Sequence, residues 1–507
     1  MNTATVSIDT NNSGPQINKN VYGQFAEHLG RVLYDGMWVG PESTIPNTRG
    51  WRNDVLEALR MLQVPVLRWP GGCFSDEYRW RDGIGPKEIR PVRVNTLWGG
   101  VEENNHVGTH EFFDLVEMLG AEAYINCNMG TGTPREMAEW LEYMTSETRS
   151  ELAELRRKNG RDEPFRVHHF GIGNETWGAG GFMEPDYYCN RYKHWSSMAR
   201  VPWHIPTNFV ASGGHGAVEE DVTRWTEHLS ANIKPNFLLK FDAVSFHYYT
   251  HPIDNENHLN FENIGETIDF PEVEWISTLS HTLRMDGFLK RNCEILDKND
   301  PDNHVALYVD EWGTWYSMPQ ENSNGMLYQQ NTLRDALVAA LNFHTFHDYS
   351  ERVRMANIAQ IANVLQSMIL TDGDKMLVTP SYHAFQLYAP FQNATRLTAT
   401  LVNVENYSLD SFSLSTLYVT AARGVDDNIY LGIINTNPNQ AYPLSIQLND
   451  KPAASLEGRQ LTADTMDAHN TFEQPETISP KAIAAQSIEA KLEINIPAKS
   501  ISVLRIN

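Results

Sequence analysis

Cysteine is scarce in this chain of 507 residues, and its four cysteines are scattered: Cys73, Cys127, Cys189 and Cys293. Four cysteines without a CxxC pair are too few for a disulfide scaffold and form no structural zinc motif. Basic side chains are also in deficit, because 40 lysines and arginines stand against 64 aspartates and glutamates, giving a formal net charge of −24. This charge repels phosphate groups, which argues against nucleic acid and anionic lipid as partners.

Long apolar runs are missing as well. No stretch approaches the roughly 18 consecutive apolar residues that a membrane-spanning helix requires. The first residues, MNTATVSIDTNNSG (1–14), contain neither the basic region nor the apolar core of a secretory signal peptide. We therefore expect a cytoplasmic protein that does not associate with membranes.

Between residues 18 and 391 the chain alternates apolar, β-branched runs with amphipathic segments, a pattern typical of parallel β/α units. The runs with the character of buried strands are 21–29, 64–71, 121–129, 166–175, 208–214, 241–249, 304–312 and 353–360. Eight such repeats predict an α/β fold of the (β/α)8 TIM barrel type. The runs at 208–214 and 353–360 are the weakest, because the first is short and the second is also compatible with a helix.

After residue 392 the pattern changes to short alternating runs such as LYVTAARG (417–424), separated by Asn, Asp, Gly and Pro. Closely spaced runs of this kind predict an antiparallel, jelly-roll-like β sandwich. TVSIDT (5–10) has the same pattern, and we expect it to add a strand to the sandwich. The predicted division is a barrel over residues 18–391 and an all-β sandwich domain made of residues 1–17 plus 392–507.

Two of the predicted barrel strands end on a carboxylate: HHFGIGNETWG (168–178) reaches Glu175, and VALYVDEWGTW (305–315) reaches Glu311. Barrel enzymes place their chemistry at the C-terminal ends of the strands. Two carboxylates on different strands are the equipment for cleaving a glycosidic bond, one giving a proton and one attacking or activating water. Either glutamate alone could simply cap the following helix.

A tryptophan follows each carboxylate, Trp177 after Glu175 and Trp312 after Glu311. An indole beside an acid can raise the carboxyl pKa and stack on a sugar ring, so the combination favours catalysis over capping and predicts that both tryptophans bind substrate. Because two nearby carboxylates cannot both carry charge cheaply, we expect Glu175 to hold a proton while Glu311 is ionised.

Five segments extend this interpretation: VYGQFAEHLGR (21–31), RWPGGCFSDEYRWRDGIGP (68–86), GIGNETWG (171–178), VSFHYYTHP (244–252) and VDEWGTWY (309–316). Together they resemble the α-L-arabinofuranosidases of glycoside hydrolase family 51, along nearly the whole chain. The resemblance implies an exo-acting enzyme that releases terminal arabinofuranosyl residues from arabino-oligosaccharides, arabinan or arabinoxylan. It further implies retention of configuration by double displacement, no metal or organic cofactor, and a homo-oligomer that is a hexamer.

The resemblance also assigns roles to individual residues. Glu175 is the implied acid/base and Glu311 the implied nucleophile. The residues implied to line the furanose subsite or position the carboxylates are Glu27, Cys73, Asn174, His247, Tyr249 and Gln360. Gln360 rests on the short ANIAQ stretch alone.

Several of these residues have structural alternatives. Glu27 could pair with Arg31 or Arg68, and Tyr249 could be a satisfied core aromatic. Cys73 is more plausible as a packed thiol touching a sugar hydroxyl than as a nucleophile, because no neighbour in sequence favours a lowered pKa.

His247 and His251 have the spacing of a zinc-binding helix, but the residues between them favour a strand, which separates the two by about 13 Å. We therefore predict no metal site. Trp98 lies in a long loop after the second strand, where it could line the aglycone side of the pocket or bury against a neighbouring subunit.

Two other functions remain open at this point. An endo-β-1,4-glucanase or xylanase on the same scaffold would differ by having an open cleft in place of a pocket. A non-catalytic sugar-binding protein would not need both carboxylates, and the presence of Glu175 and Glu311 argues against it.

Overall fold

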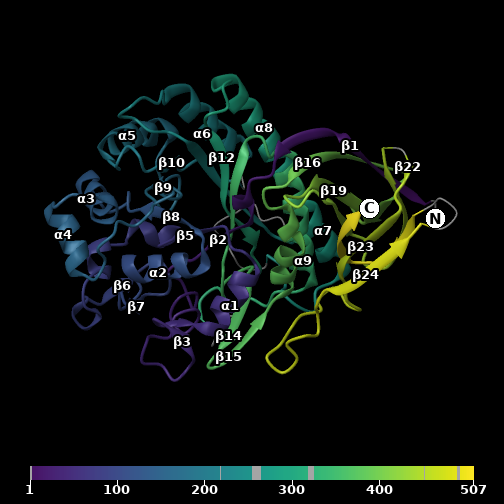
Figure 1. Ribbon diagram of the computed structural model, residues 1–507, viewed down its shortest axis with the longest axis horizontal. Coiled ribbons are helices and arrows are strands. Elements are labelled where there is room, and N and C mark those ends of the chain that lie inside the picture. Colours follow the sequence, from purple (N-terminus) through teal and green to yellow (C-terminus); the bar gives the residue numbers. More distant parts are fainter. Residues whose placement is uncertain are drawn as a thin grey trace.

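The computed structural model describes residues 3–216, 219–253, 264–317, 325–449, 451–487 and 492–506. Two bodies lie side by side in Figure 1, a barrel surrounded by helices and a curved β sheet formed mainly by the C-terminal part of the chain. Among the described residues, no helix is long and apolar enough to cross a membrane.

The first body is a closed barrel of parallel strands that follow one another in chain order. Its strands are β2 (Gly23–Phe25), β5 (Val66–Trp69), β8 (Glu122–Cys127), β9 (His169–Ile172), β10 (Asn208–Ala211), β11 (Ala243–Thr250), β12 (Ala306–Thr314) and β13 (Val353–Ile358). Six lie within runs that the sequence predicted, including the two weakest, and β11 and β12 extend one and two residues beyond their predicted runs. The predicted TIM barrel is therefore confirmed.

Helices cover the outside of the barrel. They are α1 (Asn53–Met61), α2 (Thr109–Leu119), α3 (Pro134–Thr145), α4 (Glu151–Lys158), α5 (Pro185–Met198), α6 (Glu219–Asn232), α7 (Glu272–Thr282), α8 (Arg284–Asn299), α9 (Leu333–Asp348) and α10 (Pro380–Tyr388). In the chain, α1 to α9 lie between the barrel strands, and α10 follows the last strand. Local sequence explains where they begin: the Thr133 hydroxyl accepts the N–H of Glu136, and Pro134 occupies the first turn of α3.

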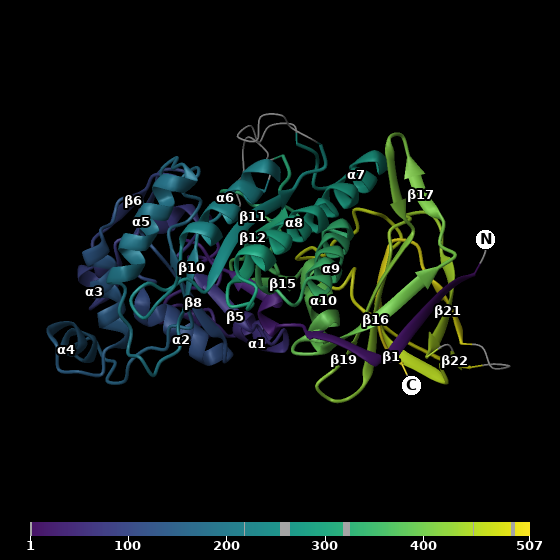
Figure 2. The ribbon, with the colours of Figure 1, turned by 90° about the horizontal axis from the view of Figure 1, so that it is seen from above.

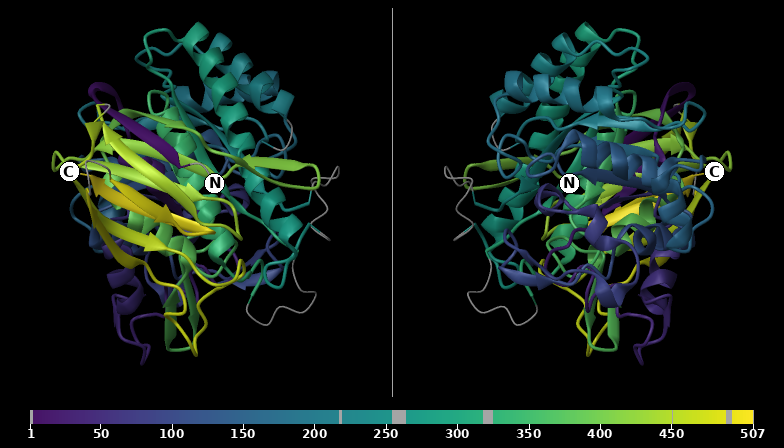
Figure 3. Two further views of the ribbon diagram at one scale, coloured as in Figure 1. Left: turned by 90° about the vertical axis from the view of Figure 1, so that its right-hand side faces the viewer. Right: turned by 90° about the vertical axis from the view of Figure 1, so that its left-hand side faces the viewer.

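The second body is a ten-stranded sheet in the order β22, β21, β1, β16, β19, β20, β26, β23 and β24, with β25 paired to β21. The strands are β1 (Ala4–Gln16), β16 (Thr395–Val402), β19 (Leu417–Arg423), β20 (Ile429–Asn435), β21 (Tyr442–Leu448), β22 (Lys451–Pro452), β23 (Ser455–Leu461), β24 (Lys481–Gln486), β25 (Glu493–Ile496) and β26 (Ser500–Ile506). As expected, β1 joins this sheet. Its pairing with β21 is parallel, so the domain is mixed and not purely antiparallel (Figure 3).

Two helices lie between the barrel and the sheet. In Figure 2, α9 and α10 lie on the side of the barrel that faces β16 and β19, and both helices contact strands of the sheet. Every residue of α9 from Leu333 to His347 is buried, because this helix has protein on all sides.

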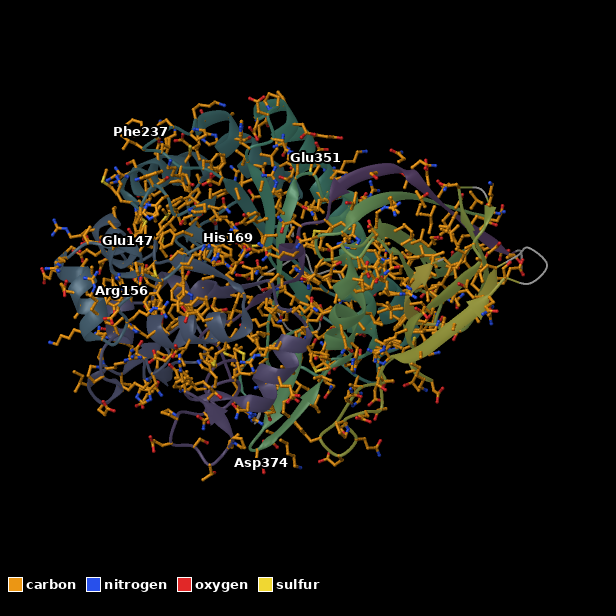
Figure 4. The ribbon with its side chains drawn as sticks, viewed as in Figure 1. Glu147, Arg156, His169, Phe237, Glu351 and Asp374 are labelled. Atoms are coloured by element: carbon orange, nitrogen blue, oxygen red, sulfur yellow. The ribbon has the colours of Figure 1, made fainter. Side chains whose placement is uncertain are left out.

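Among the described residues, four two-stranded hairpins lie outside the barrel and the ten-stranded sheet, and the sequence did not predict them. They are β3 (Asn47–Thr48) with β4 (Trp51–Arg52), β6 (Arg93–Asn95) with β7 (Val101–Glu103), β14 (Ile369–Asp372) with β15 (Lys375–Val378), and β17 (Asn406–Leu409) with β18 (Phe412–Ser415). Asp374, labelled near the lower edge of Figure 4, lies at the turn of the β14–β15 hairpin.

Candidate active site

An irregularity in β12 directs two consecutive carboxylates into the barrel. Ser245 on β11 pairs with Tyr308, but His247, two residues later, pairs with Glu311, so β12 holds one extra residue at this point. A regular strand would send Asp310 and Glu311 to opposite faces, whereas a β-bulge re-aims a side chain. Asp310 accepts a hydrogen bond from Tyr124 of β8, across the barrel interior, at 2.7 Å. The bulge thus concentrates negative charge at the C-terminal end of β12.

Both oxygens of Glu311 are held by donors. Arg68, from β5, donates through Nη1 to Oε1 at 2.7 Å, and the Tyr249 hydroxyl donates to Oε2 at 2.8 Å. The Arg68 guanidinium is 1 % exposed and also lies over the ring of Phe25. A carboxylate that accepts from a buried guanidinium and a phenol is held in a fixed orientation by strong hydrogen bonds.

Glu175 follows β9 in a strained turn. Its φ of 40° lies in the left-handed region, which residues with a side chain enter at a cost that functional sites often tolerate. The Nδ1 atom of His247 is 2.9 Å from Oε1, and the Cys73 thiol donates to Oε2 at 3.4 Å. The Glu175 side chain is 15 % exposed, so it remains reachable from solvent.

His247 brings the two glutamates together. A carboxylate oxygen from Glu175, one from Glu311 and a ring nitrogen of His247 all lie within 4.8 Å of one another. Burial disfavours the imidazolium, but the charges of Glu311, Asp310 and Glu175 outweigh it and raise the pKa of His247 to about 10.

The proton at the centre of this cluster therefore resides on the imidazole. Burial raises the pKa of Glu175, but hydrogen bonding and the charge of His247 prevail and lower it. The direction of this shift opposes the expectation that Glu175 itself holds a proton. That expectation weighed the two carboxylates against each other and left out the cation between them.

A second carboxyl lies on the other side of Glu311. The Oε1 atom of Glu27 accepts hydrogen bonds from the Phe74 amide at 2.9 Å and from Trp98 Nε1 at 3.0 Å. Its Oε2 atom accepts from Gln360 Nε2 at 3.0 Å, and Gln360 Oε1 accepts the Glu27 amide at 3.0 Å. Burial and then the charge of Glu311 raise the pKa of Glu27 to about 7.

Asn174 offers a hydrogen-bond donor without a use in the protein. Its Oδ1 accepts from Arg68 Nη2 at 2.6 Å, which orients the amide group. The amide nitrogen is buried and has no hydrogen-bond partner among the described residues. A buried donor left unpaired is costly unless a ligand satisfies it, so Asn174 is suited to bind a sugar hydroxyl.

Comparison with known proteins places this site in a family. The profile of the α-L-arabinofuranosidase 1 domain matches residues 58–262, and that of the α-L-arabinofuranosidase C-terminal domain matches residues 310–500. An intracellular exo-α-L-arabinofuranosidase from Bacteroides ovatus is 42% identical over 504 residues, covering 99% of this chain and 95% of its own length. The chain belongs to the α-L-arabinofuranosidases of glycoside hydrolase family 51.

Solved structures agree with the assignment. The family 51 arabinofuranosidase from Xanthomonas axonopodis pv. citri has a TM-score of 0.94 at 44% identity, covering 100% of both chains. The α-L-arabinofuranosidase from Thermotoga maritima, solved as an arabinose complex, has a TM-score of 0.84 at 28% identity and 99% coverage of both chains. The enzyme is a glycoside hydrolase, and the non-catalytic alternative is excluded.

One predicted substrate contact is wrong. Trp312 is fully buried and packs between α9 and α10, with its ring against Phe343, Phe346 and Phe385. Since Glu311 points into the barrel, its neighbour Trp312 points out of it. Trp312 therefore stabilises the contact between β12 and the helices and does not reach a sugar.

The other two predicted tryptophans lie at the site. Trp98 is partly exposed and donates to Glu27, as described above. Trp177 is also partly exposed, and its ring centre lies 4.2 Å from that of His215, whose charge acts on Glu175. Both tryptophans can present an indole edge or face to a ligand.

The structure also agrees with the predictions that Cys73 is a packed thiol and that His247 lies on a strand. Burial and the charges of Glu175 and Glu27 raise the pKa of the Cys73 thiol well above its usual value, so the thiol is a neutral donor and not a nucleophile. His247 lies on the extended strand β11, and His251 beyond it contacts the Trp315 carbonyl oxygen at 3.0 Å, away from His247.

Two charged residues of the site, Arg68 and Asp310, were not predicted from the sequence to belong to it. Each lies inside an otherwise apolar run, VPVLRWPG (64–71) and VALYVDEW (305–312). A charged residue in the middle of a buried strand is itself a signal, because its burial is costly unless an oppositely charged group pairs with it.

Proposed function

We propose that this enzyme is an exo-acting, retaining α-L-arabinofuranosidase in which Glu175 is the acid/base and Glu311 the nucleophile. The observation that carries the proposal is the approach of the two carboxylates within 4.8 Å of each other and of His247. Retaining glycosidases hold their carboxyl groups about 5–5.5 Å apart, whereas inverting enzymes leave about 6.5–9.5 Å for a water molecule.

The contacts of each carboxylate support the roles. Arg68 and Tyr249 hold both oxygens of Glu311 in a fixed orientation, as attack by a nucleophile requires. Glu175 shares a proton with His247 and is partly open to solvent, as a group that gives and takes protons must be. Attack by Glu311 inverts the anomeric carbon, and water activated by Glu175 inverts it again, so configuration is retained.

The groups around Glu311 support a furanose subsite. The side chains of Asn174, Glu27 and Cys73 are fixed in place by hydrogen bonds with Arg68, Gln360 and Glu175, respectively, and the amide hydrogens of Asn174 stay free. Hydrogen-bonding groups of both kinds converging on one point are what a small polyhydroxylated ring requires. His247 and Tyr249 act on the catalytic carboxylates.

The substrates that we propose are the chain ends of arabino-oligosaccharides, arabinan or arabinoxylan, hydrolysed inside the cell without a metal or organic cofactor. The relative from Bacteroides ovatus, which is named an intracellular exo-α-L-arabinofuranosidase, supports both the site of cleavage and the compartment. We further propose that the enzyme acts as a homo-oligomer.

Hydrolysis of an aryl α-L-arabinofuranoside, followed by proton NMR, tests this proposal. The first-formed sugar should be α-arabinofuranose, because the reaction retains configuration. Initial formation of the β anomer would overturn the mechanism.

The endo-acting alternative is tested by the size of the products released from arabinoxylan. An exo enzyme releases monosaccharide from the start, whereas internal cleavage of the backbone would produce oligosaccharides.

A further inference from the structure

Asp310 is a buried charge that the proposed mechanism does not yet use. Its side chain is 2 % exposed, and its Oδ2 accepts from the Tyr124 hydroxyl at 2.7 Å. Its Oδ1 lies 3.2 Å from Nε2 of His247. Asp310 therefore contacts the imidazole on the side opposite to Glu175.

The imidazole of His247 thus lies between two carboxylates. Nδ1 is 2.9 Å from Glu175 and Nε2 is 3.2 Å from Asp310. A neutral imidazole has one N–H, whereas an imidazolium presents an N–H toward each carboxylate. The contact with Asp310 is an ion pair without hydrogen-bond geometry, because Oδ1 has no hydrogen-bond partner among the described residues, and the charges on both sides favour a doubly protonated ring.

Other charged or titratable groups face this pair from the neighbouring elements. They are Arg68 on β5, Cys73 in the turn that follows it, Tyr124 on β8, His215 beyond β10, Tyr249 on β11 and Glu311 on β12. Besides His247, the Arg68 guanidinium faces Asp310, with Nε 3.7 Å from Oδ2. Burial raises the pKa of Asp310, but Arg68 and His247 outweigh it and hold that pKa at about 2, so Asp310 is an anion throughout the working range.

We propose that Asp310 is a positioning residue that holds His247 doubly protonated, so that His247 and Glu175 together store the proton delivered to the leaving group. This inference rests on the assignment of Glu175 as the acid/base. In the first step Glu175 takes the Nδ1 proton of His247, which becomes neutral, and passes this proton to the leaving oxygen. In the second step Glu175 takes a proton from the attacking water and returns it to Nδ1, so the pair ends as it began.

The His247–Glu175 pair can deliver its proton only below a certain pH, and that upper limit depends on Asp310. Above the pKa of His247, about 10, the pair has lost its proton and cannot protonate a leaving group. An opposite charge within about 4–6 Å shifts a pKa by about 1–3 units. Removing the charge of Asp310 should therefore move the basic limb of the kcat/KM profile to lower pH by about one unit or more.

The test compares kcat/KM as a function of pH for the native enzyme and for Asp310→Asn, which keeps the size of the side chain and removes its charge. Two substrates are used, an arabino-oligosaccharide and a nitrophenyl α-L-arabinofuranoside. The basic limb should shift down for the oligosaccharide, and the loss of rate should be larger there than for the nitrophenyl substrate, whose leaving group needs no proton.

Tyr308→Phe is the matched control. Tyr308 is on the same strand, is 3 % exposed and contacts Nδ1 of His169 at 3.2 Å, so its loss perturbs the same strand without touching the pair. The basic limb of this variant should stay in place. A purely structural role for Asp310 would lower the rate of Asp310→Asn without moving the limb, and that result would overturn the inference.

If thermal unfolding shows that Asp310→Asn does not fold, a second variant tests the same role of Asp310. Asp310→Ser removes the same charge and leaves room for a water molecule, and it should show the same shift of the basic limb. Native enzyme that hydrolyses neither substrate would reject the proposed function. Native activity with an unmoved limb in both variants would reject the role of Asp310 alone.

Discussion

Glu27 and Gln360 hold each other through two hydrogen bonds, one from the Gln360 side chain to the Glu27 carboxyl and one from the Glu27 amide to the Gln360 side chain, each 3.0 Å long. Glu27 follows β2 and Gln360 follows β13, two strands that are neighbours in the barrel. The pair therefore joins the first barrel strand to the last at the edge of the proposed furanose subsite.

Burial at this place makes Glu27 a source of pH-dependent stability. Its pKa is about 7 in the folded protein against 4.5 for an ordinary glutamate. The folded state therefore binds more protons than the unfolded state between these two values, and the free energy of unfolding falls as pH rises through this window. Complete ionisation of Glu27 at higher pH lowers the free energy of unfolding by on the order of 3 kcal/mol.

Glu27→Gln should remove this dependence. The variant should gain stability relative to the native enzyme as pH rises from 4.5 to 8, as measured by urea unfolding at each pH. It should also bind arabinofuranosides more weakly, because the subsite loses a carboxyl acceptor. A stability difference that stays constant over this pH range would contradict the shifted pKa of Glu27.

Replacement of the proposed acid/base should depend on the leaving group. Glu175→Ala should lose about 10²–10⁴ in rate on natural arabinosides, the usual contribution of a general acid. Arabinosylation of the enzyme by a nitrophenyl substrate should be largely spared, since nitrophenolate leaves without a proton. Stopped-flow measurement of that step checks the assignment, and an equal loss on both classes of substrate would reject it.

The two tryptophans Trp312 and Trp98 should separate stability from binding. Trp312→Ala opens a cavity among three phenylalanines and should cost about 3–5 kcal/mol of unfolding free energy with little change in KM for any folded enzyme. Trp98→Ala removes a partly exposed side chain that donates to Glu27, and it should raise KM with little change in stability. Denaturant unfolding and steady-state kinetics on both variants check this contrast.

Substrate length should matter as well. If the pocket admits only chain ends, soluble arabinotriose should be hydrolysed faster than the same concentration of terminal arabinose on insoluble arabinoxylan. Initial rates of arabinose release measure this difference. A preference for the polymer would argue against an exo-acting enzyme for imported oligosaccharides.

Much of the fold was predictable because the barrel strands are continuous apolar runs and the helices between them are amphipathic. Glu175 and Glu311 were predictable for a related reason, since each ends such a run. The role of Trp312 was not, because the side on which it lies depends on a bulge in β12 that leaves no mark in the sequence.

The protonation of the site was also beyond the sequence. It depends on the contacts of His247 on β11 with Glu175, which follows β9, and with Asp310 and Glu311 on β12. Spacing along the chain identifies carboxylates, but the cation that lies between them is found only in three dimensions. The same holds for Arg68, whose partners Asn174 and Glu311 are more than 100 residues away.

The assignment of Glu311 as nucleophile and Glu175 as acid/base is tested most directly by azide rescue. Glu311→Gly should abolish hydrolysis and leave a hole of about one carboxylate, from which azide can attack an activated α-arabinofuranoside and give the β-azide. Glu175→Ala should form the glycosyl-enzyme normally and release the α-azide. Proton NMR of the two products decides: a β-azide from Glu311→Gly and an α-azide from Glu175→Ala are the predicted results, and an α-azide from Glu311→Gly would contradict the mechanism.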